Sequence, residues 1–273
     1  MKKLSASVVS FIATQLPDFK GKVKIIRALG SMCHGAYVQG KYGVLMQADL
    51  NDNTNLWALL GWYDAVANEI KQIRKGDAFI DIGANAGVFS LMAGQRVGRE
   101  GIVLAFEPQR SLFAKLVSNI QANKLTNIFC FNLAISDRTR MVEMDDVDTH
   151  HTGIASIHEI STRKAKSNIW AVNPLADMKI IEKMLMDRIV TVKIDVEGHE
   201  LHVLKGVSSF LESDNVRKVI VEIDDGNLKR FDTKISDIYT FMDQYDFLPT
   251  IINSKSRHFD EVFVKKTDAY NAR

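Results

Sequence analysis

The stretch Ala78-Phe-Ile-Asp-Ile-Gly-Ala-Asn-Ala-Gly87 decides how this chain folds. Its first five residues are an apolar run typical of a buried parallel strand, and the small residues that follow form a tight turn. Val88 to Arg96 then has the apolar spacing of a helix. A strand, a turn and a helix in this order leave the free N–H groups of the helix pointing at the turn. A nucleotide-like ligand can bind there, because residues with little side chain let it come close.

A second apolar run, Ile102 to Phe106, ends in Glu107, twenty-four positions after Gly83. Dinucleotide-type folds use an acid at the tip of the second strand, roughly 20 residues past the glycine turn, to bind a ribose diol. The turn is not the G-x-G-x-x-G fingerprint, because Asn85 stands at its second glycine and Gly87 comes one position early. The chain also has no G-K-S/T phosphate loop. NAD and ATP are therefore disfavoured as cofactors.

Composition excludes several function classes. The 273 residues are 46% hydrophobic and 25% charged, with a formal charge of +2, which is typical of one large α/β domain with an appendage. Thirty-five basic residues against thirty-three acidic ones give no case for a nucleic-acid or anionic-membrane partner, and no basic run with interleaved aromatic residues stands out. Cys33 and Cys130 suggest neither a metal cluster nor a disulfide framework, so the expected location is cytoplasmic.

Residues 1–75 carry no cofactor motif, and we predict an N-terminal cap that packs on the sheet. An amphipathic helix is expected to end near Pro17, with one apolar face made of Leu4, Val8, Phe11, Ile12 and Leu16. A hairpin should lie between Ala36 and Leu50, and a second helix should run from Thr54 to about Lys75. No apolar run approaches the length of a membrane span. Trp62 and Tyr63 are expected to close a core, with a substrate-facing wall as the alternative.

From Gly76 onward strands and helices alternate, which predicts a doubly wound, mostly parallel sheet in a domain of residues 76–273. The expected strands are Ala78–Ile82, Ile102–Glu107, Ile128–Leu133, Ile189–Asp195, Lys218–Ile223, Leu248–Ile252 and Glu261–Lys265. The last two are closely spaced and predict an antiparallel edge. The segment Met141–Arg188 is longer than a usual crossover, so we expect a loop-like insertion near the active-site mouth.

Four motifs together resemble the FkbM family of S-adenosylmethionine-dependent methyltransferases. They are Asp81-Ile-Gly-Ala-Asn-Ala-Gly87, Phe106-Glu107-Pro108, Asn132 with Ala134, and Val192-Lys-Ile-Asp-Val-Glu-Gly-His-Glu200. The resemblance covers about residues 76–265. It implies an α/β class I methyltransferase fold, which is Rossmann-like, and S-adenosylmethionine as the cofactor, with S-adenosylhomocysteine as the product. It also implies transfer to a hydroxyl of a sugar, glycan or natural-product acceptor, whose identity does not follow from the fold.

The resemblance assigns cofactor roles to seven residues: Asp81, Gly83, Asn85, Gly87, Glu107, Asn132 and Ala134. The turn from Gly83 to Gly87 would lie under the methionine portion, with Asp81 orienting it. Glu107 would bind the ribose hydroxyls, and Asn132 and Ala134 would edge the adenine.

A hydroxyl is a poor nucleophile at neutral pH, so a catalytic group must take its proton. Asp195 ends a strand at the edge of the sheet where ligands bind in such folds. Asp195 and Glu197 are the candidates for orienting the acceptor or acting as general base, with His199 in reserve. The competing interpretation is that Glu197 and Glu200 cap a helix beginning at Leu201.

Two further acidic groups are weighed as possible sites. Glu222, Asp224 and Asp225 could hold Mg²⁺ beside Asp195, but turn acids bonded to solvent or backbone are the favoured interpretation, so no metal ligand is predicted. A denser loop cluster could supply a histidine base, although a solvated loop is favoured there too. That cluster consists of Asp145, Asp146, Asp148, His150 and His151.

Two other functions remain open. A nicotinamide-dependent oxidoreductase would also use Glu107 to bind the ribose, but this chain lacks the second glycine of the dinucleotide fingerprint. A non-catalytic nucleoside-binding scaffold would bind the cofactor and methylate nothing. The motif around Asp195 favours a methyltransferase, because it has no role in the first alternative and no need in the second.

Overall fold

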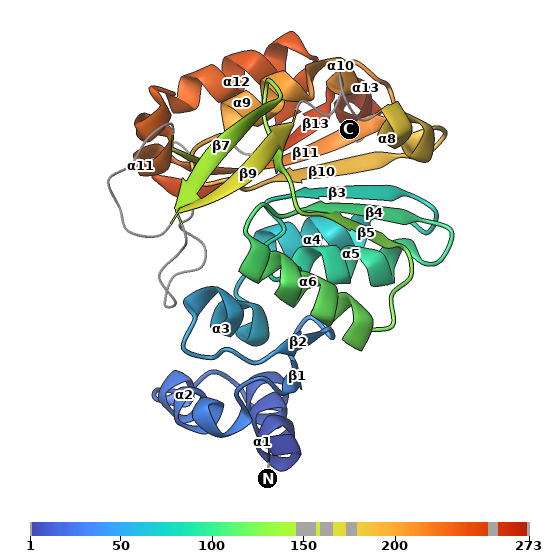
Figure 1. Ribbon diagram of the computed structural model, residues 1–273. Helices are drawn as coiled ribbons and strands as arrows, with labels where there is room; N and C mark the ends of the chain where they lie inside the picture. The colour runs from blue at the N-terminus through green and yellow to red at the C-terminus, as the bar shows by residue number, and fades with distance from the viewer. Residues whose placement is uncertain (1, 146–156, 159–165, 173–178, 251–255, 272–273) are drawn as a thin grey trace.

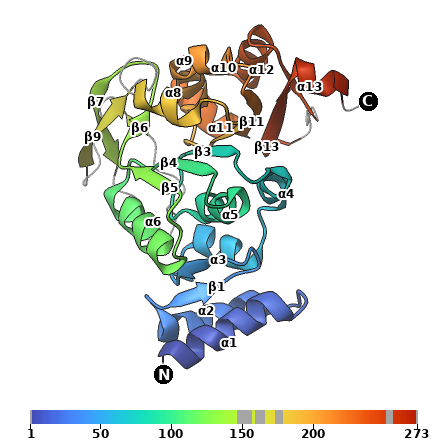
Figure 2. The same cartoon turned by 90° about the vertical axis from the view of Figure 1, so that its right-hand side faces the viewer.

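The computed structural model describes residues 2–145, 157–158, 166–172, 179–250 and 256–271. A central sheet carries helices on both of its faces, and the N-terminal segment lies at one end of the molecule (Figures 1 and 2). Among the residues described, none of the helices combines the length and the apolar character that crossing a bilayer requires.

The central sheet has seven strands in the order β12-β13-β11-β10-β3-β4-β5. They are β3 (Ala78–Ile82), β4 (Ile102–Phe106), β5 (Ile128–Phe131), β10 (Val190–Ile194), β11 (Val216–Asp224), β12 (Phe247–Pro249) and β13 (His258–Lys265). The first five of these are parallel, and β13 pairs antiparallel with both β11 and β12. This confirms the doubly wound sheet and its antiparallel C-terminal edge. The strand order reverses between β3 and β10, where a crevice opens at the carboxyl ends of the strands.

Two hydrophobic clusters explain why the apolar strands are buried on both faces. On one face, Phe79 packs with α4 (Asp64–Gln72), α5 (Val88–Val97) and α6 (Arg110–Ala122). On the other, Ile80 packs with a second group of helices, because neighbouring strand residues point to opposite faces. That group is α8 (Lys179–Leu185), α9 (Glu200–Gly206), α10 (Ser208–Leu211) and α12 (Ile235–Gln244). Three short helical pieces complete the C-terminal part: α11 (Asp225–Leu228), η1 (Lys229–Phe231) and α13 (Lys266–Asn271).

The N-terminal segment contains four elements before α4. They are α1 (Lys2–Gln15), α2 (Lys22–Cys33), a hairpin of β1 (Tyr37–Gln39) and β2 (Leu45–Gln47), and α3 (Asn53–Leu60). The hairpin confirms the sequence-based prediction. The prediction of one helix from Thr54 to Lys75 is wrong, because Gly61 adopts a left-handed conformation (φ +73°) that ends α3 before α4 begins.

Polar contacts fix this segment to the domain that follows. The side-chain Oδ1 of Asn119, on α6, accepts the N–H of Gln47 at 2.8 Å. The Asn123 side chain accepts the N–H of Leu45 at 2.9 Å and donates to its carbonyl oxygen at 2.7 Å. The hairpin is therefore bonded to the end of α6, while the boundary at residue 75 stays a prediction.

The insertion after β5 forms a second sheet, so the expectation of a simple loop is wrong. Its order is β6-β9-β7-β8, and its strands are β6 (Ala134–Ile135), β7 (Arg140–Asp145), β8 (Ile157–His158) and β9 (Lys166–Val172). The predicted strand Ile128–Leu133 ends at Phe131, because the chain then leaves the central sheet to pair with β9. Asp146, Asp148, His150 and His151 lie outside the described residues.

Candidate active site

Contacts within the protein shape the turn after β3. Gly83 has a φ of +84°, and a Cβ at this position would overlap the carbonyl oxygen of Asp195. Gly87 has a φ of +95°, and its Cβ would overlap a leucine side chain of α6. Asn85 is also left-handed (φ +51°), and its side-chain oxygen accepts the N–H of Ala86 at 2.7 Å. Both positions therefore favour glycine because of their positive φ, and at Gly83 the backbone of Asp195 also excludes a side chain.

Glu107, directly after β4, is bonded to the same turn. Its Oε2 accepts the N–H of Asn85 at 2.7 Å, and its Oε1 accepts the N–H of Gln109 at 2.8 Å. Burial raises the pKa of Glu107 to about 7, although these two bonds lower it. Each carboxylate oxygen keeps a further lone pair, so Glu107 can still accept hydrogen bonds from hydroxyl groups. The Asn132 amide donates to the carbonyl oxygens of Glu107 (2.9 Å) and Pro108 (2.8 Å) and so holds this strand end in place.

One cavity of about 620 Å³ joins this turn to the end of β10. Its size is typical of a small-molecule site. The N-terminal segment closes one side of it with Trp57, Trp62 and Tyr63. Tyr63 packs edge-on against Phe89 at 5.4 Å between ring centroids, as expected of a core residue. Trp57 and Trp62, by contrast, are 41% and 48% exposed, so the alternative of a substrate-facing wall fits these two side chains.

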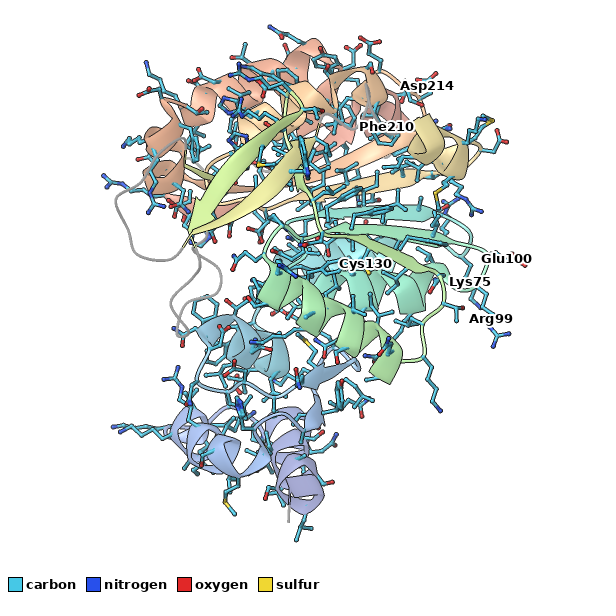
Figure 3. All side chains as sticks on the ribbon, in the orientation of Figure 1. Lys75, Arg99, Glu100, Cys130, Phe210 and Asp214 are labelled. Atoms are coloured by element: carbon cyan, nitrogen blue, oxygen red, sulfur yellow. The ribbon has the colours of Figure 1, made fainter. Side chains whose placement is uncertain are left out.

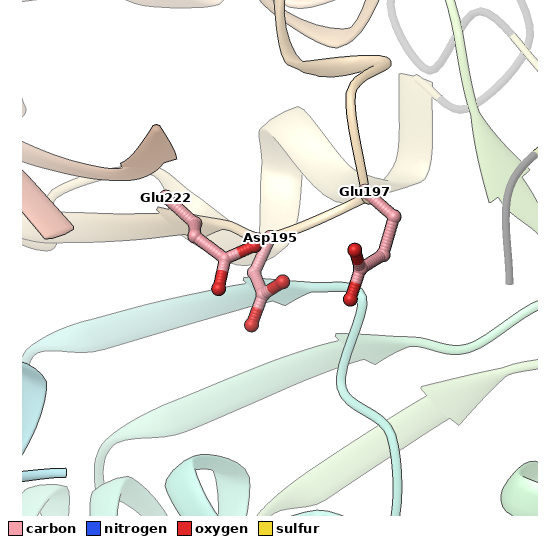
Figure 4. A group of neighbouring side chains, drawn as sticks. All are labelled: Asp195, Glu197 and Glu222. Atoms are coloured by element: carbon pink, nitrogen blue, oxygen red, sulfur yellow. The ribbon is translucent and has the colours of Figure 1, made fainter. Parts of the chain in front are cut away.

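Three carboxyl groups meet in the lining of the same cavity. Asp195, Glu197 and Glu222 each offer an oxygen atom, and these atoms lie within 4.8 Å of one another (Figure 4). Lys193 Nζ lies 2.9 Å from Asp195 Oδ2, and His258 Nε2 lies 2.9 Å from Glu222 Oε1. Burial acts to raise the pKa of Asp195. The charge of Lys193 and the hydrogen bonds from Glu222 and Lys193 together outweigh burial and hold this pKa below its usual range. Asp195 is therefore ionised at neutral pH.

Glu197 differs from Asp195 in its protonation. Burial, followed by the neighbouring charges of Glu222 and Asp195, raises the pKa of Glu197 to about 9. Its Oε2 accepts the side-chain N–H of Asn227 at 2.6 Å. The residue is left-handed (φ +57°), which is uncommon for a non-glycine residue and here points to a functional constraint. At neutral pH Glu197 is protonated, so it can donate a hydrogen bond into the cavity that it lines.

Residues 81–249, which include the turn, Glu107 and the three carboxyl groups, match the family model described as the methyltransferase FkbM domain. The chain belongs to the FkbM methyltransferase family. The match confirms the resemblance that the four motifs indicate, and the strand order agrees with the class I methyltransferase fold expected for it.

The relatives of this chain include a named methyltransferase. The hexuronic acid methyltransferase AglP of Haloferax volcanii is 28% identical over 169 residues, which are 62% of this chain and 64% of AglP. The chain thus matches less than two thirds of that relative's length. Among solved structures, a SAM-dependent methyltransferase from Aquifex aeolicus is 10% identical, with a TM-score of 0.44 over 79% of this chain and 94% of that one. TYW2 of M. jannaschii, in complex with AdoMet, is 12% identical, with a TM-score of 0.44 over 85% and 87%.

The FkbM site brings most of the predicted residues together. Seven of them line the cavity: Gly83, Asn85, Glu107, Ala134, Asp195, Glu197 and His199. Asp81, Gly87 and Asn132 lie behind this lining. Asp81 is fully buried, where it accepts a hydrogen bond from Ser90 Oγ at 2.5 Å and lies 3.7 Å from Lys193 Nζ. These three residues support the site without facing its interior.

His199 is poorly suited to take a proton. It is 2% exposed, its Nε2 lies 3.0 Å from Ser136 Oγ, and its ring stacks on that of His202 at 4.3 Å. Burial lowers the pKa of His199 to about 3, so the ring is neutral at physiological pH and a weak base. The ionised carboxylate of Asp195 is better suited than His199 to accept a proton.

The capping interpretation is not confirmed for Glu197 or Glu200. Glu200 lies in the first turn of α9, but the N-cap residue is His199 and it makes no side-chain cap bond. Glu200 Oε1 accepts the N–H groups of Val196 (3.2 Å) and Gly198 (3.0 Å), just before α9. The Mg²⁺ group weighed from the sequence does not gather as expected either. Asp224 accepts the N–H of Asn227 at 2.8 Å to cap α11, and Asp225 pairs with Lys229 at 2.6 Å.

Sequence analysis missed several residues of this site. Lys193 could have been found, because it lies on β10 two residues before Asp195, which directly follows that strand. Residues two apart along extended chain point to the same face of the sheet. His258 had no such signal, since antiparallel pairing of β13 with β11 places it opposite Asp224. Asn227 comes from α11 and Arg230 from η1, and only the folded chain brings them to the cavity.

Proposed function

We propose that this chain transfers the methyl group of S-adenosylmethionine to an oxygen atom of a sugar-type acceptor. The observation that carries the proposal is a single cavity whose wall contains both the turn with Glu107 and the ionised Asp195. Membership of the FkbM family supports methyl transfer. A nicotinamide-dependent oxidoreductase would leave the carboxyl cluster without a role, and a scaffold would not need it.

The cofactor fits the half of the cavity around Glu107. Glu107 is a buried carboxylate with two backbone partners and remaining lone pairs, which suits a ribose diol. The backbone of Gly83 and Asn85 would face the methionine portion, and Ala134 would border the adenine. When bound, the cofactor supplies an electrophilic methyl carbon on a positively charged sulfur.

Asp195 is the proposed proton acceptor. Lys193 keeps it ionised, and the protonated Glu197 beside it would orient the acceptor by hydrogen bonding. As the acceptor oxygen bonds to the methyl carbon, its proton passes to the Asp195 carboxylate. The electron pair of the broken carbon–sulfur bond stays on sulfur, which leaves S-adenosylhomocysteine. Alignment of the two reactants can supply roughly 7–11 kcal/mol of the rate enhancement.

We propose that this transfer needs no metal ion. Asp195, Glu197 and Glu222 could hold Mg²⁺ by their oxygen atoms. Each of them already has a protein partner, however: Lys193, Asn227 and His258, respectively. Methyl transfer is expected to continue unchanged in EDTA. A loss that only Mg²⁺ restores would instead assign a metal to this cluster.

The acceptor side of the cavity suits an acidic sugar. Trp57 and Trp62 offer exposed aromatic rings on which the apolar face of a sugar ring can pack. Arg230 lines the cavity and forms no ion pair with any described residue, so its guanidinium is free to bind a carboxylate. AglP is, by its name, a hexuronic acid methyltransferase. We place the methylated group on a hydroxyl, because a carboxylate beside the ionised Asp195 would be repelled.

Transfer of a labelled methyl group tests these proposals together. The protein, labelled S-adenosylmethionine and matched glucuronide and glucoside acceptors are incubated, and the products are then treated with mild alkali. The expected product is a labelled glucuronide that keeps its label, because an ether resists alkali and a carboxyl ester does not. Release of the label would move the methyl group to the carboxylate.

The control pair is Glu107→Ala and Glu100→Ala. Glu100 is an exposed acid on a turn remote from the cavity (Figure 3), so its loss should leave transfer unchanged. Glu107→Ala should abolish it. If the protein binds the cofactor but labels neither the glucuronide nor the glucoside, a non-catalytic nucleoside-binding scaffold would be favoured instead.

The cellular setting also stays a proposal. Cys33 and Cys130 are free thiols, which is consistent with a cytoplasmic location. We propose that the chain acts on small molecules or glycans and not on nucleic acid, on the grounds of its nearly balanced charge.

A further inference from the structure

Helix α1 turns its apolar face away from the protein. Leu4, Val8 and Phe11 are 72%, 41% and 57% exposed, whereas Val9 and Ala13 on the opposite face are fully buried. The sequence correctly predicts this amphipathic helix, but three of the five residues on its predicted apolar face point to solvent. Ala6, Val9 and Ala13, with the partly buried Ile12, form the contact with the neighbouring elements.

The connecting turn and α2 carry further exposed apolar side chains. Phe19, Ile25 and Met32 are 43%, 44% and 53% exposed, and the two residues of α2 lie two helical turns apart on one face. Six of the fourteen large hydrophobic side chains that are exposed among the described residues therefore lie within residues 4–32. Single exposed apolar residues are normal on a protein surface, but a cluster at helical spacing marks an interaction site.

The same segment concentrates positive charge. Residues 2–34 contain six basic residues and one acid, a formal charge of +5, so the rest of the chain carries −3. The one acid, Asp18, is already paired with Lys22 at 3.0 Å and lies 3.8 Å from Lys41. Lys20 and Lys24 are exposed and have no carboxylate partner among the described residues. The nearly neutral charge of the whole chain hides this asymmetry.

Apolar side chains beside unpaired lysines fit one kind of partner best. A second copy of the chain would bring two surfaces of charge +5 together, which opposes association. An anionic lipid surface attracts the lysines, and its acyl region accepts the apolar side chains. We propose that the helical hairpin of α1 and α2 binds the surface of an anionic membrane.

The position of the hairpin allows this binding without blocking the cavity. Both views place α1 and α2 at one end of the molecule, beyond α3 (Figures 1 and 2). The cavity is lined by residues from Asn53 onward, and no residue of the hairpin contributes to it. The bound protein therefore keeps its cavity accessible, and an acceptor carried by a lipid would be held close to it.

Co-sedimentation of the full chain with vesicles tests the proposal. The protein should sediment with vesicles of phosphatidylcholine and phosphatidylglycerol, stay in solution with phosphatidylcholine alone, and be released by high salt. Lys20→Glu with Lys24→Glu should reduce the bound fraction about tenfold or more, because each basic residue near an anionic surface contributes about fivefold. The matched control is Lys75→Glu with Arg99→Glu, two exposed cations away from the hairpin (Figure 3), which should bind as the wild type does.

A second pair of variants tests the apolar part. Leu4→Ser with Phe11→Ser should reduce binding about tenfold or more, while Met186→Ser, an equally exposed apolar residue elsewhere, should not. Circular dichroism confirms that each variant is folded. Equal binding to neutral vesicles, or no binding to either kind, would overturn the proposal. A dimer in light scattering that Phe11→Ser dissociates, without vesicle binding, would assign the face to a second copy. None of these readouts depends on methyl transfer.

Discussion

The two halves of the cavity are built in different ways. The half around Glu107 comes from consecutive elements, β3, α5 and β4, and is fixed by backbone contacts. Two N–H groups bind Glu107, and Gly83 is pressed against the backbone of Asp195. The acceptor half is made of side chains from distant parts of the chain, among them Trp62, Lys193 and His258.

This difference indicates which residues of the cavity can vary and which cannot. Backbone contacts around Gly83 depend on a few residue types at fixed spacing, so this half is rigid and can be recognised from a short motif. The side chains around Asp195 come from separate elements, so no single short motif determines them. One fold can therefore present the same cofactor to different acceptors.

The largest effect is expected where the two halves touch, at Gly83→Ala. The new Cβ would overlap the carbonyl oxygen of Asp195, and φ is +84°. We expect the free energy of unfolding to fall by about 3 kcal/mol or more, as measured by urea denaturation. Gly43→Ala is the matched control, because φ is +78° but nothing lies within 4 Å of the added Cβ, so it should cost only about 1 kcal/mol. If both variants lose the same free energy of unfolding, the contact between Gly83 and the backbone of Asp195 is not tight.

Asp195→Asn should impair the acceptor half of the cavity and leave the half around Glu107 intact. Loss of the proton acceptor is expected to lower kcat by about 10²- to 10⁴-fold. The affinity for S-adenosylhomocysteine, measured by calorimetry, should change little, because the Glu107 half is intact. His199→Gln serves for comparison and should have the smaller effect on kcat, since His199 is neutral and packed against Ser136. A reversed order of the two variants would reject Asp195 as the base.

The fold could be predicted where local pattern decides. Buried apolar runs such as Ala78–Ile82 and the glycine turn predict the parallel sheet correctly, because parallel strands covered on both faces must be apolar throughout. The second sheet was missed because its strands are short or polar: β9 (Lys166–Val172) begins Lys-Ser-Asn. The break at Gly61 was missed because an apolar pattern continues on both sides of it.

The site could be predicted only in part for a related reason. Glu107 and Asp195 end strands of one parallel sheet, so their meeting follows from the strand order. The pairing of Glu222 with His258 depends on the register of β11 against β13, which the sequence does not give. The roles of Trp57 and Trp62 depend on how the N-terminal segment packs, and no motif marks that packing.

A pH series tests the cofactor half. Burial raises the pKa of Glu107 from 4.5 to about 7, so between these values the folded protein without ligand holds this proton more tightly than the unfolded chain does. The stability contributed by that proton is lost as the pH rises from about 4.5 to 7. Ribose hydroxyls favour the ionised form, so the affinity for S-adenosylhomocysteine should rise about tenfold per pH unit below 7 and then level off. Calorimetry of Glu107→Gln should show weaker binding without this rise; a slope that persists in the variant would assign it to another group.

The smallest effect is expected at the N-terminal wall. Trp62→Ala should raise the KM for the acceptor about 2- to 10-fold, by loss of one aromatic packing surface. Both kcat and the affinity for S-adenosylhomocysteine should stay near the wild-type values, because within the described part of the chain Trp62 forms no hydrogen bond with Glu107 or Asp195. Trp170→Ala is the control: Trp170 is 52% exposed on β9 and does not line the cavity, so its loss should leave KM unchanged. Equal weakening of cofactor and acceptor binding by Trp62→Ala would mean that the wall serves both halves, and the separation between a backbone-built half and a side-chain-built half would no longer hold.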